Sequence, residues 1–276
     1  MKIAQIQMNV SADKSANIQR ACNLIRWAGA VDIAVLPEMF CCPYDNAFFW
    51  DYAETEGGEA YRALSALARE KGIYIVGGSI PLLEGDKLYN ACFVFDPEGR
   101  CIARHRKTHL FDIDVEGGQR FCESDVFAPG SDVTTFDTPW GVMGLCICFD
   151  FRFEELARLL ALRGAQVIFV PAAFNMTTGP AHWELLFRQR AVDNQCFTVG
   201  TSPARDNGAS YTAWGHSIVC DPWGSVVSQC DENTRIVVTE LDLERVQAVR
   251  RQLPLLSARR TDVYQLQQRE NCDIIK

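Results

Sequence analysis

Short apolar runs alternate with longer stretches of helical periodicity along most of the chain. KIAQIQM (2–8) has the alternation of a strand, and residues 11–28 follow with the spacing of an amphipathic helix. DIAVLPE (32–38) contains the apolar run of a short buried strand, and a helix over 59–70 and a strand over 73–80 continue the series. This order of elements is typical of an α/β protein in which helices cover the sheets.

Two later segments have the pattern of β-hairpins. DPEG (96–99) joins two β-rich runs, and DPWG (221–224) joins two more within HSIVCDPWGSVVSQ (216–229). Hairpins pair strands in antiparallel fashion, so their presence in an alternating chain indicates mixed sheets. No repeat, low-complexity block or long linker divides the sequence. We therefore predict a single domain over residues 1–276.

Composition and charge indicate a globular protein, since 48% of its 276 residues are hydrophobic and 22% are charged. A formal net charge of -8 argues against a nucleic-acid partner. No apolar run reaches about 18 residues and the first residues lack signal-peptide features, so we expect no membrane contact. The 12 cysteines, in a chain without an export signal, indicate reduced thiols and a cytoplasmic location. The basic run RRQLPLLSARR (250–260) is interpreted as a solvated helix face or an interface.

Cys148 is the cysteine whose context most favours chemistry. A β-rich run, VMGLCIC, ends at this residue and the helical pattern FDFRFEELARLLALRG begins directly after it. At such a strand-to-helix junction the first helical N–H groups point at a ligand. A helix N-terminus also lowers the pKa of a thiol, so we expect a reactive thiolate here. Against this, any one cysteine among 12 is more often a small buried hydrophobe.

The contexts of Cys146, Cys41 and Cys42 favour chemistry less. Cys146 lies two residues before Cys148 on the same face of the strand, and we interpret it as core filler. The four histidines form no cluster with this pair, so we expect no metal site. The Cys-x-Cys spacing also differs from that of a redox motif, and the adjacent Cys41 and Cys42 are expected to be reduced thiols.

Two charged residues follow predicted strands and could assist a thiol. Glu38 comes directly after a fully apolar strand, where a carboxylate is either exposed in a loop or directed into a pocket at the sheet edge. Lys107 also ends a strand, but it follows the basic segment 104–106, and such clusters usually form a solvated face. From the residues alone, both alternatives remain open.

The three candidates lie in segments that resemble a known family. LPEMF, HRKTHLFDID and GLCICFDFRF are similar to the signature segments of the nitrilase, or carbon–nitrogen hydrolase, superfamily, in the order Glu, Lys, Cys. GGSIP, FNMTTGPAHWELL and SPARDNGASYTAWGHS are similar to its omega-amidase branch. The resemblance implies a four-layer α-β-β-α sandwich with two mixed sheets, whereas the residues alone predict a doubly wound sheet. It also implies a homodimer or higher oligomer, with the segment from about 250 to 276 at a subunit interface.

The resemblance also implies roles for individual residues. Cys148 is expected to be the nucleophile, Glu38 the general base, and Lys107 the cation that stabilises the oxyanion. The backbone N–H of Phe149, at the start of the predicted helix, is expected to be the second oxyanion donor. Glu123, which would otherwise be an ordinary loop acid, is expected to orient Lys107 and the substrate amide. This chemistry requires neither a metal nor an organic cofactor.

Omega-amidases hydrolyse 2-oxo acid amides such as 2-oxoglutaramate and 2-oxosuccinamate to the dicarboxylic oxo acid and ammonia, through a cysteine thioester. The far end of such a substrate is a carboxylate, so a cation is expected in the pocket. Arg152 is the candidate, because a guanidinium binds a carboxylate with two parallel hydrogen bonds. The alternative is an arginine that pairs with Asp150 or Glu154 at the helix start.

Three further residues, Tyr44, Phe174 and Thr178, resemble pocket-lining positions of this branch, with local packing as the alternative for each. The sequence also departs from the branch, which has glycine at the position of Cys146 and tyrosine at that of Phe149. These departures leave the substrate range open, and other functions remain as alternatives. They include a broader aliphatic amidase, a deaminated-glutathione amidase of the same superfamily, and a non-catalytic binding or scaffold protein.

Overall fold

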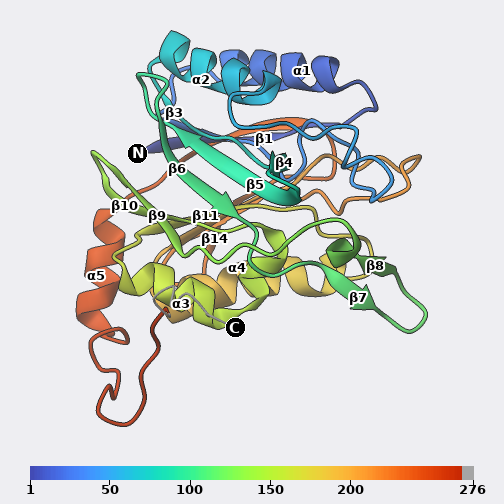
Figure 1. The fold of residues 1–276 in the computed structure, drawn as a ribbon. Coiled ribbons are helices and arrows are strands. Elements are labelled where there is room, and N and C mark those ends of the chain that lie inside the picture. Colours follow the sequence, from blue (N-terminus) through green and yellow to red (C-terminus); the bar gives the residue numbers. More distant parts are fainter. Residues whose placement is uncertain (269–276) are drawn as a thin grey trace.

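The computed structural model describes residues 1–268, which form two large sheets packed face to face with helices on both outer sides (Figure 1). The helices are α1 (Lys14–Trp27), α2 (Glu59–Lys71), α3 (Glu154–Leu162), α4 (Gly179–Asn194) and α5 (Glu244–Gln252). Helices α1 and α2 cover one sheet, α3 and α4 cover the other, and α5 stands at one end of the layers. This is the four-layer sandwich that the resemblance implies, so the doubly wound sheet expected from the residues alone is wrong.

The first sheet has the strand order β15-β1-β2-β3-β5-β4, and β6 also pairs with β5. Its pairings β1–β2 and β2–β3 are parallel and the others are antiparallel, which confirms a mixed sheet. The strands of this sheet are β1 (Lys2–Gln7), β2 (Ile33–Val35), β3 (Tyr74–Val76), β4 (Ile80–Glu84), β5 (Lys87–Phe95), β6 (Cys101–Arg106) and β15 (Arg235–Glu240).

The second sheet has the order β14-β13-β12-β11-β10-β9 and is also mixed, with β10–β11 and β11–β12 parallel. A separate two-stranded sheet pairs β7 with β8. The strands of these two sheets are β7 (Asp112–Asp114), β8 (Arg120–Cys122), β9 (Thr134–Thr138), β10 (Gly141–Leu145), β11 (Val167–Pro171), β12 (Phe197–Thr201), β13 (Ile218–Cys220) and β14 (Val226–Gln229).

Both predicted hairpins are confirmed. The N–H of Gly99 donates to the carbonyl of Asp96 at 2.8 Å between β5 and β6, and that of Gly224 donates to Asp221 at 2.9 Å between β13 and β14. Each glycine has a positive φ, 77° and 83°, which is why glycine ends these turns. The strand expected over 73–80 is instead divided into β3 and β4.

Alternating side chains of β1 show how the layers are joined. Ile3 faces the other sheet and belongs to the core shared by the two sheets, α3 and α4, whereas Ala4 and Ile6 belong to the core beneath α1 and α2. The fully buried Gln5 also faces inward, and its Nε2 donates to the carbonyl of Gly200 at 2.7 Å in the second sheet. This bond satisfies the buried donor across the two sheets, whereas Oε1 of Gln5 has no partner among residues 1–268.

The basic run over 250–260 begins at the end of α5, where Arg250 fixes the helix to the body. Its guanidinium donates to the carbonyls of Ala165 at 2.8 Å and Gln195 at 3.1 Å. The predicted subunit-contact segment reaches beyond the described residues, because positions 269–276 lie outside them. Within 1–268, no helix is sufficiently long and apolar to span a bilayer.

Candidate active site

The three candidates Glu38, Lys107 and Cys148 each follow a strand, and the strands come from both large sheets. Glu38 lies three residues beyond β2, Lys107 directly follows β6, and Cys148 lies three residues beyond β10. All three side chains are buried, with 0%, 0% and 4% of their surface exposed. Lys107 is therefore not part of a solvated basic face, because period-two alternation along β6 turns it and His105 inward.

Lys107 is held between two carboxylates. Its Nζ atom lies 2.8 Å from Oε1 of Glu38 and 2.8 Å from Oε2 of Glu123, and all three side chains are fully buried. Burial alone would lower the pKa of Lys107, but the charges of Glu123 and Glu38 outweigh burial and raise it. Lys107 is therefore a fixed cation at the centre of a cluster that carries two acids. The structure brings Glu123 into contact with Lys107, as the resemblance implies.

Asn90 completes this cluster and was missed by the sequence analysis. Its Nδ2 donates to Oε1 of Glu38 and to Oε1 of Glu123, each at 2.9 Å. Its backbone carbonyl accepts the backbone N–H of Lys107 at 2.8 Å. One amide side chain on β5 therefore fixes the separation of the two acids. The signal was present, because Asn90 lies two residues before Cys92 in a predicted strand, and this spacing places a polar side chain on the same face as a core residue.

Tyr44 also reaches the cluster. Its hydroxyl lies 3.3 Å from Nζ of Lys107 and 3.4 Å from oxygens of both Glu38 and Glu123. The ring packs against Tyr211, with ring centroids 4.6 Å apart, and the Tyr211 hydroxyl donates to the carbonyl of Ala173. Tyr44 therefore contacts the charged groups of the cluster as well as neighbouring rings, so local packing is not its only role.

Glu38 retains one free oxygen. Lys107 and Asn90 occupy Oε1, whereas Oε2 has no hydrogen-bond partner among residues 1–268. Burial raises the pKa of Glu38, Lys107 opposes this shift, and the charge of Glu123 adds to it. The carboxylate is thus a stronger base than an exposed glutamate, and it has an oxygen available to accept a proton.

The expectation of a lowered pKa at Cys148 is wrong. Burial raises the pKa of this thiol well above its usual range, the charge of Glu38 raises it further, and Lys107 only partly offsets these effects. Glu38 and Cys148 interact closely enough for each to affect the pKa of the other. The resting thiol is therefore protonated, and a base beside it is required before the sulfur can attack.

The local backbone explains part of this difference, because no α-helix begins at Cys148. A short 3₁₀ turn spans Cys148–Arg152, and α3 begins only at Glu154. Cys148 itself has a φ of 46°, a conformation that is strained for a residue with a side chain. The first hydrogen bond of the turn runs from the N–H of Asp150 to Ile147 at 3.0 Å. The N–H of Phe149 comes one residue before the first donor of the turn, so it has no hydrogen-bond partner within the turn.

Asp150 connects the turn of Cys148 to the end of the strand that carries Lys107. One carboxylate oxygen accepts the N–H groups of Thr108 at 3.1 Å and His109 at 2.8 Å, and the other accepts that of Ile147 at 3.1 Å. The rings of His105 and His109 also bond Asp150, at 2.9 and 2.8 Å. Burial would raise the pKa of Asp150, but the histidines outweigh it and hold the pKa well below its usual range.

Arg152 lies beside aromatic rings, not in an ion pair. Its guanidinium carbon is 4.6 Å from the ring centroid of Phe174 and 5.8 Å from that of Phe149, and one of its nitrogens is 3.1 Å from Nδ1 of His182. No carboxylate of residues 1–268 forms a salt bridge with it, so the alternative pairing with Asp150 or Glu154 is not observed. Burial lowers the pKa of Arg152.

Phe174 lies in the loop before α4, and Thr178 is the residue that directly precedes this helix. Phe174 is buried against Trp183, with ring centroids 5.0 Å apart, and its ring also contacts the Arg152 guanidinium. The backbone N–H and hydroxyl of Thr178 both donate to Oδ1 of Asn175, at 2.8 and 2.9 Å. Phe174 therefore lies beside Arg152, a candidate binding residue, whereas the hydroxyl of Thr178 is engaged in a hydrogen bond to Asn175.

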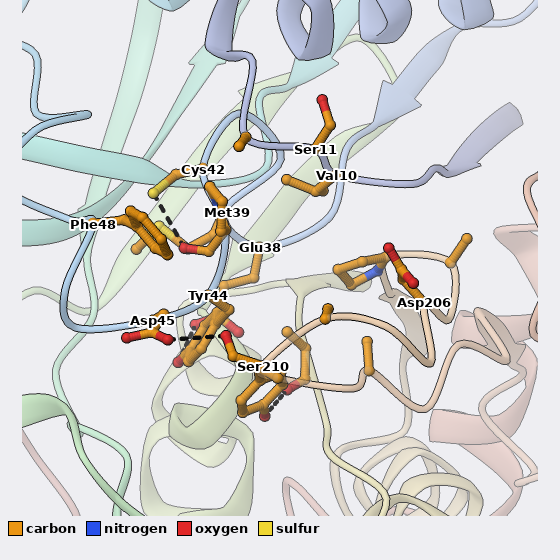
Figure 2. Close-up of a pocket in the computed structure, with 18 residues that line it drawn as sticks. Val10, Ser11, Glu38, Met39, Cys42, Tyr44, Asp45, Phe48, Asp206 and Ser210 are labelled. Carbon is orange, nitrogen blue, oxygen red and sulfur yellow. Dashed lines mark hydrogen bonds between the residues drawn. The ribbon is translucent and has the colours of Figure 1, made fainter.

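A cavity of about 450 Å³ reaches Glu38 from the surface, and Figure 2 shows the residues around it. Glu38, Met39 and Ala173 belong to its buried part, and Asp206 and Ser210 belong to its exposed rim. Tyr44 and Tyr211 also line it, and Cys148, Arg152, Phe174 and Thr178 are not among its lining residues.

The described residues contain no group of three or more His, Cys, Asp and Glu side chains placed to hold a metal ion. Cysteines within 1–268, Cys146 and Cys148 included, form no disulfide.

Comparison with known proteins agrees with this geometry. Residues 2–251 match the model of the carbon-nitrogen hydrolase family. The chain is similar to omega-amidase NIT2 of Mus musculus, 49% identical over 271 residues and covering 98% of each chain. The Homo sapiens omega-amidase NIT2 is 48% identical over 271 residues, with the same coverage. Saccharomyces cerevisiae Nit3, a member of branch 10 of the nitrilase superfamily, has a similar structure, with a TM-score of 0.87, 42% identity and coverage of 94% of this chain and 96% of that one.

Proposed function

The chain belongs to the carbon–nitrogen hydrolase family, and we propose that it is an omega-amidase acting on the terminal amide of 2-oxo acid amides. The proposal rests mainly on sequence identity: the chain is 48–49% identical to relatives named omega-amidases, over 98% of both chains. The buried cluster of Glu38, Lys107 and Glu123 beside Cys148 supports an amide hydrolysis that uses a cysteine nucleophile.

In the first half of the reaction, Glu38 takes the proton of the Cys148 thiol as the sulfur attacks the amide carbon. The raised pKa of Glu38 supports this role, because the acceptor must compete with a thiol whose own pKa is also raised. The tetrahedral intermediate then loses ammonia, which receives the proton now held by Glu38. A thioester between Cys148 and the oxo acid remains.

In the second half, Glu38 takes a proton from water, which attacks the thioester carbon. Collapse of this second intermediate releases the dicarboxylic oxo acid, and the thiol of Cys148 recovers its proton from Glu38. One carboxylate thus acts as base and acid in both halves, which requires only that it remain fixed and deprotonated at rest. Lys107 and Asn90 hold its other oxygen in place.

Negative charge on the substrate oxygen is stabilised by Lys107 and by the N–H of Phe149. Lys107 is a fixed cation, and the Phe149 N–H belongs to the turn that carries the nucleophile. Loss of one such donor typically costs about 3–4 kcal/mol of transition-state stabilisation. Glu123, which also bonds the backbone N–H of Phe111 at 2.7 Å, orients Lys107 for this task.

Arg152 is the proposed partner of the substrate's remote carboxylate. It is a partly buried cation without a carboxylate partner within residues 1–268, and burial lowers its pKa. A bound carboxylate would therefore compensate the cost of burying the guanidinium. Phe174 supports the guanidinium through its ring face.

Ammonia release from a panel of amides tests this function. We expect 2-oxoglutaramate and 2-oxosuccinamate to have higher kcat/KM than monocarboxylic amides, nitriles or deaminated glutathione. A clear preference for deaminated glutathione or for neutral aliphatic amides would overturn the omega-amidase assignment within the family. No turnover of any amide would support a binding or scaffold role.

We also propose that the protein is a cytoplasmic homo-oligomer of at least two chains. Leu253, Leu255, Val263 and Tyr264 are exposed apolar side chains in the segment after α5, and exposed apolar surface favours burial against a second copy. Light scattering after size exclusion should give a mass of at least two chains. A monomer at micromolar concentration would contradict this proposal.

A further inference from the structure

His105 is a fully buried histidine that the proposed mechanism does not use. It lies on β6 two residues before Lys107, so both side chains point to the inner face of the first sheet. Its Nε2 atom is 2.9 Å from Oδ2 of Asp150, and its Nδ1 atom is 3.0 Å from Oγ1 of Thr134. Thr134 belongs to β9 of the second sheet, and Asp150 to the turn that follows β10 of that sheet (Figure 1). The ring therefore joins the strand that carries Lys107 to the segment that carries Cys148.

The hydrogen-bond roles at this ring follow from the charge of Asp150. Burial would raise the pKa of Asp150, but its bonds to the histidines hold the pKa well below its usual range, so the carboxylate is ionised. An ionised carboxylate only accepts hydrogen bonds, so Nε2 of His105 donates to it. Nδ1 faces the hydroxyl of Thr134, which is able to donate or to accept. Both ring nitrogens thus have partners, and the orientation of the ring is fixed.

Ile147 and Asp150 close a small ring around the nucleophile. The N–H of Asp150 donates to the carbonyl of Ile147 at 3.0 Å, and the N–H of Ile147 donates to Oδ2 of Asp150 at 3.1 Å. Cys148, whose φ is 46°, and Phe149 lie between these two bonds. A residue with a side chain keeps such a conformation only where its surroundings enforce it. The position of Oδ2 therefore affects both the thiol and the N–H proposed as an oxyanion donor.

The two oxygens of the Asp150 carboxylate are held unequally. Within the described part of the chain, Oδ1 accepts three bonds, from the backbone N–H groups of Thr108 and His109 and from the ring of His109. Oδ2 accepts two bonds there, from the N–H of Ile147 and from His105. Without His105, the carboxylate would be free to turn about Oδ1, and only the bond from Ile147 would oppose this movement. His105 is thus the side chain that fixes the oxygen on the nucleophile's side.

We propose that His105 is a positioning residue of the reaction, acting through Asp150 on the turn of Cys148. It keeps the thiol and the N–H of Phe149 in place relative to the ammonium of Lys107. This inference rests on the proposed omega-amidase function, in which these three groups act on one amide carbon and its oxygen. Because a displacement of about 1 Å can cost about 10²-fold in rate, loss of His105 should slow the chemical step.

Substrate binding should depend much less on His105. Arg152, the proposed partner of the substrate carboxylate, lies at the other end of the same turn. That end is held separately by Arg190, whose guanidinium donates to the carbonyls of Phe151 at 3.2 Å and Arg152 at 2.7 Å. A positioning role for His105 is therefore expected to change kcat and to leave KM nearly unchanged.

Two amides of different length at position 105 test the proposal. His105→Gln can place an amide N–H near the position of Nε2 and keep the donor to Asp150, whereas the shorter His105→Asn reaches only toward Thr134. We expect His105→Asn and His105→Met to lower kcat about tenfold to 100-fold, with KM for 2-oxoglutaramate changed by less than about threefold. His105→Gln should recover kcat to within about fivefold of the parent. Equal kcat in the Gln and Asn variants, or a loss found only in KM, would overturn the proposal.

His109 provides a matched control for the loss of a ring bond. Its ring also bonds Asp150, at 2.8 Å, but on the oxygen that accepts two further donors, and it stacks on Phe153. His109→Phe removes this bond and keeps an aromatic ring beside Phe153, so it should lower kcat by less than about threefold. Losses of kcat that are equal in His109→Phe and His105→Met would contradict a specific role for His105.

Urea unfolding shows whether each variant is folded under the assay conditions. If His105→Met does not fold, the Gln and Asn variants decide the question by themselves. Normal kcat in a folded His105→Met would overturn the positioning role and leave the omega-amidase function intact. If the parent hydrolyses another amide but not 2-oxoglutaramate, the omega-amidase function fails, and the same variants are compared on that amide. No hydrolysis of any amide by the parent would overturn both proposals.

Discussion

The Nζ atom of Lys107 lies 2.8 Å from Oε1 of Glu38, and neither side chain has exposed surface. Glu38 comes from the loop after β2 and Lys107 from the end of β6, so this contact is made between two distant parts of the first sheet. It leaves the second oxygen of Glu38 free for proton transfer, while the ammonium remains available to stabilise an oxyanion.

Replacing Lys107 should remove both functions of this pair. We expect Lys107→Met to lower kcat by about 10²–10³-fold, because an oxyanion donor is lost. It should also destabilise the fold by about 3–5 kcal/mol, since buried carboxylates lose their counter-charge. Steady-state kinetics and urea unfolding measure the two effects.

Lys14 offers a matched control for that variant. It pairs with Glu54 at the same distance, 2.8 Å, but outside the catalytic cluster. Lys14→Met should therefore keep kcat close to that of the parent enzyme. Equal losses in the two variants would mean that Lys107 serves only the stability of the fold.

The pH dependence should report the raised pKa of Glu38. The reaction needs this carboxylate ionised, so kcat/KM should fall as the pH drops through its pKa, which lies above the ordinary value of about 4.3. Because Glu38 is coupled to Glu123 through Lys107, the profile gives the apparent pKa of the cluster. An acid limb at or below about pH 4.3 would show that Glu38 is not the base.

Asn90 should matter for activity, although it has no direct part in the chemistry. Asn90→Ala removes hydrogen bonds to two buried charges, each worth about 1.5–3 kcal/mol, and should lower kcat about tenfold to 100-fold. Asn194 is a buried asparagine on α4 that donates to the carbonyl of Arg190. Asn194→Ala should affect unfolding but not kcat, and the opposite ranking would contradict the positioning role of Asn90.

Asn90 also shows the limit of prediction from the sequence. Local patterns predicted both hairpins and the alternation of strands and helices, because turn residues and side-chain periodicity are properties of neighbouring positions. Which sheets pack against each other depends on contacts between distant residues, such as that of Gln5 with Gly200. The second sheet was accordingly expected only from family resemblance.

The surroundings of Cys148 were also beyond prediction from the sequence. The segment 149–164 has helical periodicity, yet its first residues form a 3₁₀ turn. Asp150 makes bonds there to Thr108 and His109, more than 40 residues earlier in the chain. No local pattern predicts such partners, and the raised pKa of the thiol depends on the burial they help to produce.

Asp150→Asn should disturb this connection and change the dependence of stability on pH. A carboxyl whose pKa is lowered by folding stabilises the native state above its unfolded pKa of about 3.9, and that stabilisation is lost as the pH falls toward the folded pKa. The parent should therefore lose more stability than Asp150→Asn below about pH 4. Urea unfolding at several pH values measures this, and parallel curves would contradict it.

Arg152 should control recognition of the substrate carboxylate. Arg152→Gln should raise KM for 2-oxoglutaramate about tenfold to 100-fold, as expected for loss of a charged hydrogen-bonding partner. Neutral aliphatic amides, which lack that carboxylate, provide the comparison and should show little change in KM. Equal changes for both substrates would indicate that Arg152 maintains only the packing around Phe174.

The most direct test of the account is the rate of ammonia release from 2-oxoglutaramate by two matched variants, Cys148→Ala and Cys146→Ala. Both cysteines are buried in the same core, so the two substitutions have similar structural consequences. We predict that Cys148→Ala loses turnover by about 10⁴-fold or more, whereas Cys146→Ala remains within about tenfold of the parent. Turnover retained in Cys148→Ala, with the loss found in Cys146→Ala, would contradict the assignment of the nucleophile.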